Sequence, residues 1–240
     1  MVAEFVRILP GDRSVQNSHE FCYGRLNDIN RRNINMSTVL EKEIERPDSF
    51  VAPPYPVLRL TLPEYWALRD SGLLDHDIRY EFLEGWIVPK MTQKPPHAWT
   101  VTHIDQVVEL PSEWLNRVQC AINTDDSEPE PDVAIVRAPE TQYVNRHPRG
   151  DDIGLLIEVA DATLRQDRRK AEIYAADGIA VYWIINLVDR QIEVHTNPDA
   201  ANRAYRNREV FTPGMSIEVE LDGNTIQSLP VDDLLPPTTP

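Results

Sequence analysis

The 240-residue sequence is 41% hydrophobic and 26% charged, proportions typical of a globular protein that is long enough to bury a core. No apolar run approaches the roughly 20 residues that a membrane-spanning helix needs, which excludes a membrane partner and predicts a cytoplasmic location. The formal charge of −15 excludes a surface that is basic throughout and attracts nucleic acid at long range, but it does not describe any single cleft.

The first quarter of the chain lacks the regular hydrophobic pattern of the remainder. We expect residues 1–57, with their asparagine-rich and proline-rich stretches, to form a flexible N-terminal extension. The residues after Met36 resemble an ordinary protein start, so we hypothesise that residues 1–35 are a misassigned upstream extension, which mass spectrometry of the native protein tests. The regular pattern predicts one domain over residues 58–236 and a disordered tail over residues 237–240.

Hydrophobic periodicity and turn residues predict the secondary structure of this domain. Thr61 is a suitable N-cap for a helix that runs to about Asp70. Tyr80 to Lys90 reads as a hairpin that turns at Glu84-Gly85. The remaining predicted elements are a helix over 98–110, buried strands over 132–136 and 155–159, a helix over 167–176, a buried strand over 181–185, and short strands over 191–194, 216–219 and 225–227. The strand–helix–strand unit requires a partly parallel sheet, so the predicted fold class is α/β.

Two acidic residues interrupt regions that packing alone would make apolar. Glu158 lies inside the predicted strand 155–159 and shares a strand face with Leu156 and Ala160. An ionised carboxylate buried there is destabilising by several kcal/mol unless a cation or hydrogen-bond donors receive it. Asp132 stands at the start of the preceding predicted strand, and the chain between the two acids is long enough for these strands to be neighbours.

Lys170 is a third anomaly, because it falls on the apolar side of its predicted helix. It precedes Ile173 and Tyr174 by three and four residues, so all three side chains should face the sheet. An inward lysine needs an anion, and Glu158 at the end of the preceding strand is a candidate. Two carboxylates that bind Mg²⁺, with a lysine that positions the attacking water, form a centre for phosphodiester hydrolysis. Asp132, Glu158 and Lys170 together predict such a centre.

Each of these residues also has a purely structural interpretation. Asp132 can be a turn residue, Glu158 an ion-pair partner, and Lys170 a side chain that extends its ammonium to water. Glu81 alternates out of phase with the aromatic residues beside it, which by itself indicates a solvent-facing strand position. His97 stands where a helix begins and can be a capping or surface residue. The conjunction of the first three residues on one strand–loop–strand–helix path favours the functional interpretation.

Four stretches of the sequence carry a resemblance to a known family. They are Tyr80–Gly85, Glu128–Val133, Ile157–Leu164 and Tyr182–Asn186. With these residues the chain resembles the Uma-two family of restriction-endonuclease-like proteins, within the PD-(D/E)xK nuclease superfamily, over about residues 58–236. The resemblance implies a restriction-endonuclease-like mixed β-sheet flanked by helices. It also implies Mg²⁺- or Mn²⁺-dependent endonuclease cleavage of DNA, and it leaves the oligomeric state, with a homodimer as one option, open.

The resemblance assigns roles to five residues. Asp132 matches the acid of the Pro-Asp element, Glu158 the second acid, and Glu81 the acid of the hairpin, and all three are implied metal ligands. Lys170 matches the family's helix-borne lysine, and His97 matches a histidine often found after the hairpin. The five are therefore the implied catalytic residues.

The sequence departs from the family pattern beside the lysine. The family usually has one more residue between the positions of Asp167 and Lys170. Position 160, where the wider superfamily carries its lysine, is alanine, so Lys170 serves or there is no catalytic lysine. Candidate phosphate contacts near the mouth of the predicted site are Arg146, Arg149, Arg165, Arg168 and Arg169.

Two other functions stay open at this point. The acidity of the chain and the missing residue favour a catalytically inactive nuclease-fold module that binds or regulates. In a structural oligomer, Glu158 and Lys170 would form only a buried ion pair. Metal binding without cleavage would support the former, and stabilisation on replacing both residues with apolar ones would support the latter.

Overall fold

The computed structural model describes residues 57–238. Its helices and strands, in chain order, are α1 (Leu62–Asp70), β1 (Tyr80–Leu83), β2 (Trp86–Pro89), α2 (Pro95–Val107), β3 (Trp114–Val118), β4 (Val133–Arg137), β5 (Ile153–Ala160), α3 (Leu164–Ala176), β6 (Val181–Asn186), β7 (Gln191–Asp199), β8 (Ala204–Phe211), β9 (Ser216–Leu221), β10 (Asn224–Pro230) and α4 (Val231–Leu234). Within residues 57–238, three short 3₁₀ helices lie at Glu140–Tyr143, Gly150–Asp152 and Ala200–Asn202. The predicted extension, apart from Val57, and the last two residues of the predicted tail lie outside the described residues.

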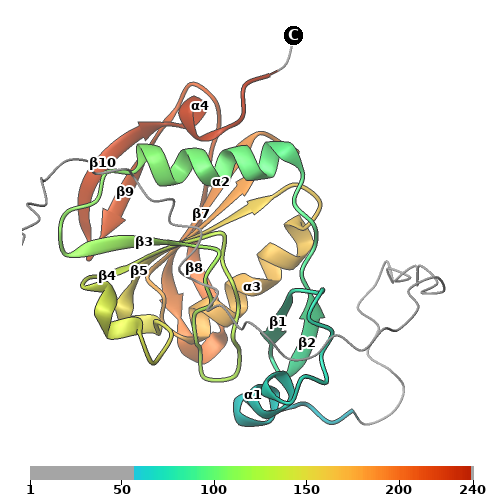
Figure 1. Cartoon of the computed structure of the whole chain (residues 1–240). Helices are drawn as coiled ribbons and strands as arrows, with labels where there is room; N and C mark the ends of the chain where they lie inside the picture. Colours follow the sequence, from blue (N-terminus) through green and yellow to red (C-terminus); the bar gives the residue numbers. More distant parts are fainter. Residues whose placement is uncertain (1–56, 239–240) are drawn as a thin grey trace, which may run out of the picture. The chain divides into compact units, whose positions relative to one another are not determined.

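A six-stranded mixed sheet forms the centre of the domain (Figure 1). The strand order is β3-β4-β5-β6-β7-β8, with β5 and β6 parallel and every other neighbouring pair antiparallel. Helix α3 is the crossover between the two parallel strands, as the predicted strand–helix–strand unit requires. The hairpin β1–β2 and the pair β9–β10 form two separate two-stranded sheets. No helix within residues 57–238 is both long and apolar enough to cross a bilayer.

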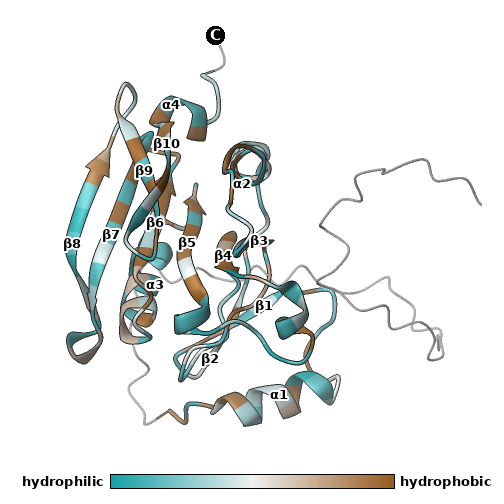
Figure 2. Ribbon diagram, turned by 90° about the vertical axis from the view of Figure 1, so that its left-hand side faces the viewer, coloured by the Kyte–Doolittle hydropathy of each residue, from teal (hydrophilic) through white to brown (hydrophobic). Residues whose placement is uncertain are grey.

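Hydrophobic side chains cover the central sheet on both faces. On one face, Leu155 and Ile157 of β5 pack with α2, the β9–β10 pair and α4. On the other face, Leu156 packs with Ile173 and Tyr174 of α3. Strand residues alternate between the two faces, and both faces are covered at β5, so β5 is buried along its whole length. Strand β8 at the sheet edge is largely exposed and hydrophilic (Figure 2). The middle of the sheet therefore offers buried positions on both sides.

The hairpin β1–β2 is held against α1 and the loop before β4. Glu84 and Gly85 both have positive φ angles, 49° and 85°, as a tight hairpin turn requires. The ring of Phe82 stacks on Tyr65 of α1 with ring centroids 4.7 Å apart. Phe82 also pairs through its backbone with Glu128 in the loop before β4. These contacts fix the orientation of β1, and hence of the residue that precedes Phe82.

The structure confirms the type of every predicted element and shifts several boundaries. The helix expected over 98–110 is α2, which starts and ends three residues earlier because proline is compatible with the first helical turn. Helix α3 also begins three residues earlier than expected. Strand β7 is about twice as long as the predicted segment. Strands β3 and β8 and the short α4 were not predicted, since their residues lack a clear apolar alternation.

Candidate active site

The two strand acids lie next to each other where β4 begins. Strands β4 and β5 are antiparallel with Val133 opposite Ile157, which places Asp132 beside Glu158. Asp132 Oδ2 accepts a hydrogen bond of 2.9 Å from the backbone N–H of Val159. Both acids are buried, each with 3% of its surface exposed. The structure thus brings together the two carboxylates that the sequence places on neighbouring strands.

Lys170 reaches these acids from α3. Its side chain lies with Ile173 and Tyr174 on the buried side of the helix, and 3% of the residue is exposed. The Lys170 Nζ atom donates hydrogen bonds of 2.9 Å to Glu158 Oε1 and 2.7 Å to Glu81 Oε1. The ammonium is therefore enclosed between two carboxylates and does not extend to water.

Glu81 is a member of the same cluster and is only 1% exposed. Its Oε1 atom also accepts a 2.9 Å hydrogen bond from the backbone N–H of Glu130. The solvent-facing position that strand alternation alone indicates is wrong. Strand β1 is covered on both sides, because Phe82 packs on α1 while Glu81 points toward α3 and the loop before β4.

His97 lies in the first turn of α2, against Asp132. Its Nε2 atom is 3.1 Å from Asp132 Oδ2, and its side chain is only 12% exposed. Its Nδ1 atom is buried and has no hydrogen-bond partner among the described residues. His97 is therefore part of the buried cluster and not a surface residue.

Two side chains that the sequence analysis did not propose for the site contact its acids directly. Tyr174 donates its hydroxyl hydrogen to Glu158 Oε1 at 2.9 Å. Gln119 Nε2 lies 3.4 Å from Asp132 Oδ1. The backbone of Gln119 has a positive φ of 52°. The helical spacing of Tyr174 from Lys170 was a usable signal, because both face the strand that carries Glu158. No local pattern marks Gln119.

Asp167 and Lys90 also lie close to the cluster. Asp167 is 4% exposed, and its Oδ2 atom accepts a 2.6 Å hydrogen bond from the Thr163 hydroxyl. Lys90 Nζ donates to the backbone carbonyl of Glu130 at 2.5 Å. Asp167 adds a fourth buried acid to the three that the resemblance identifies. Its burial in the first turn of α3 depends on how this helix packs on the sheet.

The cluster contains more negative charge than the buried cations neutralise. Burial raises the pKa of Glu158 above its ordinary value; the charge of Lys170 lowers this pKa, and the neighbouring charges of Asp132 and Glu81 oppose that lowering. Burial also raises the pKa of Asp167 well above its ordinary value, and the charge of Glu158 adds to this effect. A further cation would relieve this repulsion.

The surroundings of Glu81, Asp132 and Lys170 favour their charged forms. Burial opposes the ionisation of Glu81, but the ammonium groups of Lys170 and Lys90, together with the backbone N–H of Glu130, lower its pKa. Burial likewise opposes the ionisation of Asp132, and the hydrogen bond and charge of His97 help to lower its pKa. Burial disfavours the ammonium of Lys170, yet the surrounding carboxylates raise its pKa well above the ordinary value. Lys170 is therefore a permanent cation.

Glu81 and Glu158 each use only one carboxylate oxygen. Within residues 57–238, every hydrogen bond to these two side chains ends on Oε1, which leaves Oε2 without a partner. Paired carboxylate oxygens with surplus negative charge suit Mg²⁺ or Mn²⁺, so the residues fit a divalent cation. In the arrangement seen, with Lys170 between the glutamates, no group of three or more His, Cys, Asp or Glu side chains in the described part of the chain is placed to hold a metal.

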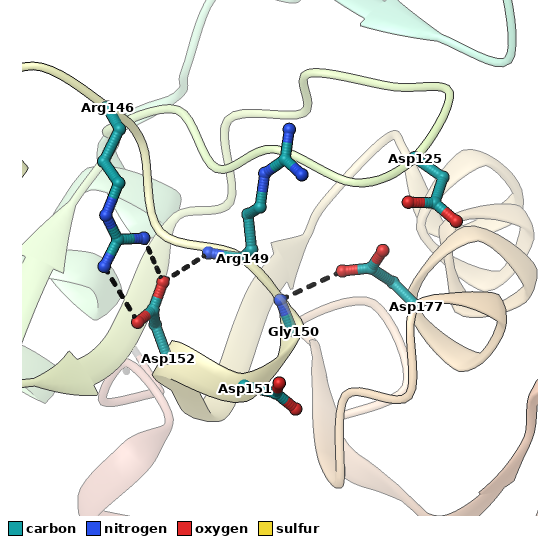
Figure 3. Close-up of a pocket in the computed structure, with 7 residues that line it drawn as sticks. All are labelled: Asp125, Arg146, Arg149, Gly150, Asp151, Asp152 and Asp177. Carbon is teal, nitrogen blue, oxygen red and sulfur yellow. Dashed lines mark hydrogen bonds and ion pairs between the residues drawn. The ribbon is translucent and has the colours of Figure 1, made fainter.

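The arginines expected to contact phosphate are mostly engaged by the chain's own carboxylates. Among them, Arg146 pairs with Asp152, Arg168 with Glu193, and Arg169 with Glu84 and Glu172. Arg146 and Arg149 line a separate pocket of about 380 Å³ together with four aspartates (Figure 3). This pocket includes Gly150 and Asp151, just before β5. Glu158 lies near the other end of β5, roughly 16 Å along the strand from its first residue, Ile153. Arg146 and Arg149 therefore do not lie beside the acid cluster.

Comparison with known proteins supports the family and the fold. The family model of Uma2, described as "Putative restriction endonuclease", matches residues 61–232. A crystal structure of "a putative nuclease belonging to DUF820" from Anabaena variabilis ATCC 29413 aligns with a TM-score of 0.57 and 18% sequence identity, over 73% of this chain and 97% of that chain. At this identity the likeness shows the fold, and it confirms the expected restriction-endonuclease-like α/β architecture. No curated protein matches the sequence.

Proposed function

The chain belongs to the Uma2 family, and from this premise we propose that it is a metal-dependent endonuclease that hydrolyses DNA phosphodiester bonds. One observation carries the proposal. Glu81 and Glu158 are buried around the ammonium of Lys170, and each holds one oxygen in hydrogen bonds and leaves the other without a partner among the described residues. The family's description as a restriction endonuclease supports DNA as the substrate.

The proposed ligands of Mg²⁺ or Mn²⁺ are Glu81, Asp132 and Glu158, which supply the oxygen donors that these ions prefer. When bound, the ion supplies positive charge that activates a water molecule and offsets the charge of the scissile phosphate. Asp132 is kept ionised and oriented by the Val159 backbone N–H and by His97. The unpaired Oε2 atoms of the two glutamates are the positions available to the ion.

Lys170 and His97 supply hydrogen bonds to the reacting groups in this proposal. The pKa of Lys170 is raised by its carboxylate neighbours despite its burial, so its ammonium remains charged. It therefore orients the attacking water or the phosphate as a donor and does not remove a proton. His97 has one nitrogen on Asp132 and a second, buried nitrogen without a partner among the described residues, which can meet a phosphate oxygen.

Calorimetric titration with Mn²⁺ and Mg²⁺, together with a plasmid-nicking assay, tests the proposal. Glu158→Gln removes the charge of the central ligand and retains its shape. Glu220→Gln is the matched control, because Glu220 is exposed on β9, away from the site. We expect wild type and Glu220→Gln to bind metal and nick DNA. We expect Glu158→Gln to lose both metal binding and nicking, while its circular dichroism spectrum remains that of a folded protein.

Other outcomes would replace the proposal. Metal binding by wild type without nicking of any DNA would support an inactive nuclease-fold binding module, which the acidic composition favours. Equal nicking by wild type and Glu158→Gln would refute the assignment of the site. Absence of both metal binding and nicking in wild type would leave Glu158 and Lys170 as a structural ion pair.

A further inference from the structure

Tyr174 and Lys170 hold the same oxygen of Glu158. Each donates a hydrogen bond of 2.9 Å to Glu158 Oε1, the tyrosine through its hydroxyl and the lysine through its ammonium. The two donors are four residues apart on α3, on the buried side of the helix. Tyr174 is fully buried, so its hydroxyl has no water to bind in place of the carboxylate.

The partner of the Tyr174 hydroxyl distinguishes it from three other tyrosines of the domain. Tyr143, Tyr182 and Tyr205 donate their hydroxyl hydrogens to the backbone carbonyls of Arg137, Asp167 and Ile179. Those bonds join segments of the chain. The bond from Tyr174 ends on a charged side chain instead, where it determines which way the carboxylate is turned.

This geometry matters when Lys170 acts on a substrate. With Tyr174 and Lys170 both on Oε1, the carboxylate of Glu158 is fixed and its Oε2 atom alone faces away from these donors. If the ammonium turns toward a phosphate, Tyr174 still holds Oε1. The carboxylate then keeps its orientation during the reaction. Tyr174 would thus act like the hydrogen-bond partners that orient metal ligands in other proteins.

We propose that Tyr174 is a positioning residue, which orients Glu158 so that Oε2 is presented to the divalent cation. The proposal rests on the proposed function, because it takes Glu158 to be a metal ligand. Its chemistry concerns binding of the ion and requires no additional reactant.

Tyr174→Phe tests this proposal, with Tyr143→Phe as the matched control. Each variant removes one oxygen atom from a buried tyrosine of the same core cluster and breaks one hydrogen bond of 2.9 Å. We expect both variants to lower the melting temperature, Tyr174→Phe more than Tyr143→Phe, because the Tyr174 hydrogen bond ends on a buried carboxylate. Mn²⁺ binding measured by calorimetry should weaken roughly 10- to 100-fold in Tyr174→Phe only, and the Mn²⁺ concentration needed for half-maximal nicking should rise by a similar factor.

The controls separate a structural role from positioning. A merely structural hydroxyl would lower the melting temperature in Tyr174→Phe and leave its Mn²⁺ affinity equal to that of Tyr143→Phe, which would overturn the proposal. A failure of wild type to bind Mn²⁺ would instead reject the proposed function, and the role of Tyr174 with it. Metal binding by wild type with an unchanged Tyr174→Phe would reject the positioning role alone.

Discussion

Replacing Lys170 with methionine removes the ammonium that two buried glutamates share. Lys170 Nζ lies 2.7 Å from Glu81 Oε1 and 2.9 Å from Glu158 Oε1, and all three residues are buried. Removing one partner from a buried ion pair destabilises a protein by about 3–5 kcal/mol, because uncompensated charge remains. Methionine retains most of the side-chain length, so little packing is lost. We therefore expect Lys170→Met to lose a large part of a total stability of about 5–15 kcal/mol.

The loss should be greatest at neutral pH. Without the ammonium, both glutamates should have folded-state pKa values above the unfolded value of about 4.3. Between the unfolded and the folded pKa values, the folded state binds more protons than the unfolded state, so the free energy of unfolding decreases as pH rises. Lowering the pH from 7 to 5 should therefore restore part of the stability of Lys170→Met. Adding Glu158→Gln should restore stability at pH 7, since one unpaired charge is removed.

Urea denaturation followed by tryptophan fluorescence at pH 7 and pH 5 measures these changes. Lys94→Met is the control, because the Lys94 side chain is 64% exposed and its ion pair with Asp161 lies at the surface. We expect this control to change stability by less than about 1 kcal/mol. Equal losses in the two lysine variants, or a Lys170→Met variant equally stable at both pH values, would refute the reasoning.

Two further predictions concern residues outside the acid cluster. Burial lowers the pKa of His195 from 6.5 to about 4. Between these pH values the folded state binds fewer protons than the unfolded state. Lowering the pH through this range should therefore reduce the free energy of unfolding by at most about 3 kcal/mol. His195→Gln should flatten the pH dependence of urea denaturation, whereas a replacement of the exposed His76 should not. Gly154→Ala should lower stability by about 1–3 kcal/mol, because its Cβ would lie 2.6 Å from Leu221 Cδ2 and 2.7 Å from Trp114 Cζ3. An unchanged melting temperature in Gly154→Ala would contradict this prediction.

Local periodicity was sufficient to identify part of the site. Glu158 interrupts a strand whose other residues are apolar, and Lys170 lies on the apolar side of a helix, so both positions indicated a charged side chain in a buried region. A short crossover places the helix against the strand that precedes it, which makes their contact a consequence of chain connectivity. The structure shows these two side chains 2.9 Å apart.

The same periodicity failed for Glu81. Strand alternation places it opposite Phe82, and from the strand alone the far side of a hairpin is solvent. Its burial depends on the docking of β1 between α1 and the loop before β4, through contacts between residues far apart in the sequence. Only the resemblance to a family indicated that Glu81 belongs with the other acids.

The sequence by itself determined the α/β class, the crossover that brings Lys170 to Glu158, and the family. These features depend on hydrophobic patterns within single elements and on short connections between them. The family resemblance indicated Glu81 and His97, but only the tertiary structure showed the contacts that bury them in the cluster. It alone added Asp167 and showed that Arg146 and Arg149 lie elsewhere. Such placements depend on packing between distant segments. No local pattern encodes this packing, since each side chain's surroundings are determined by elements that are not its neighbours in the chain.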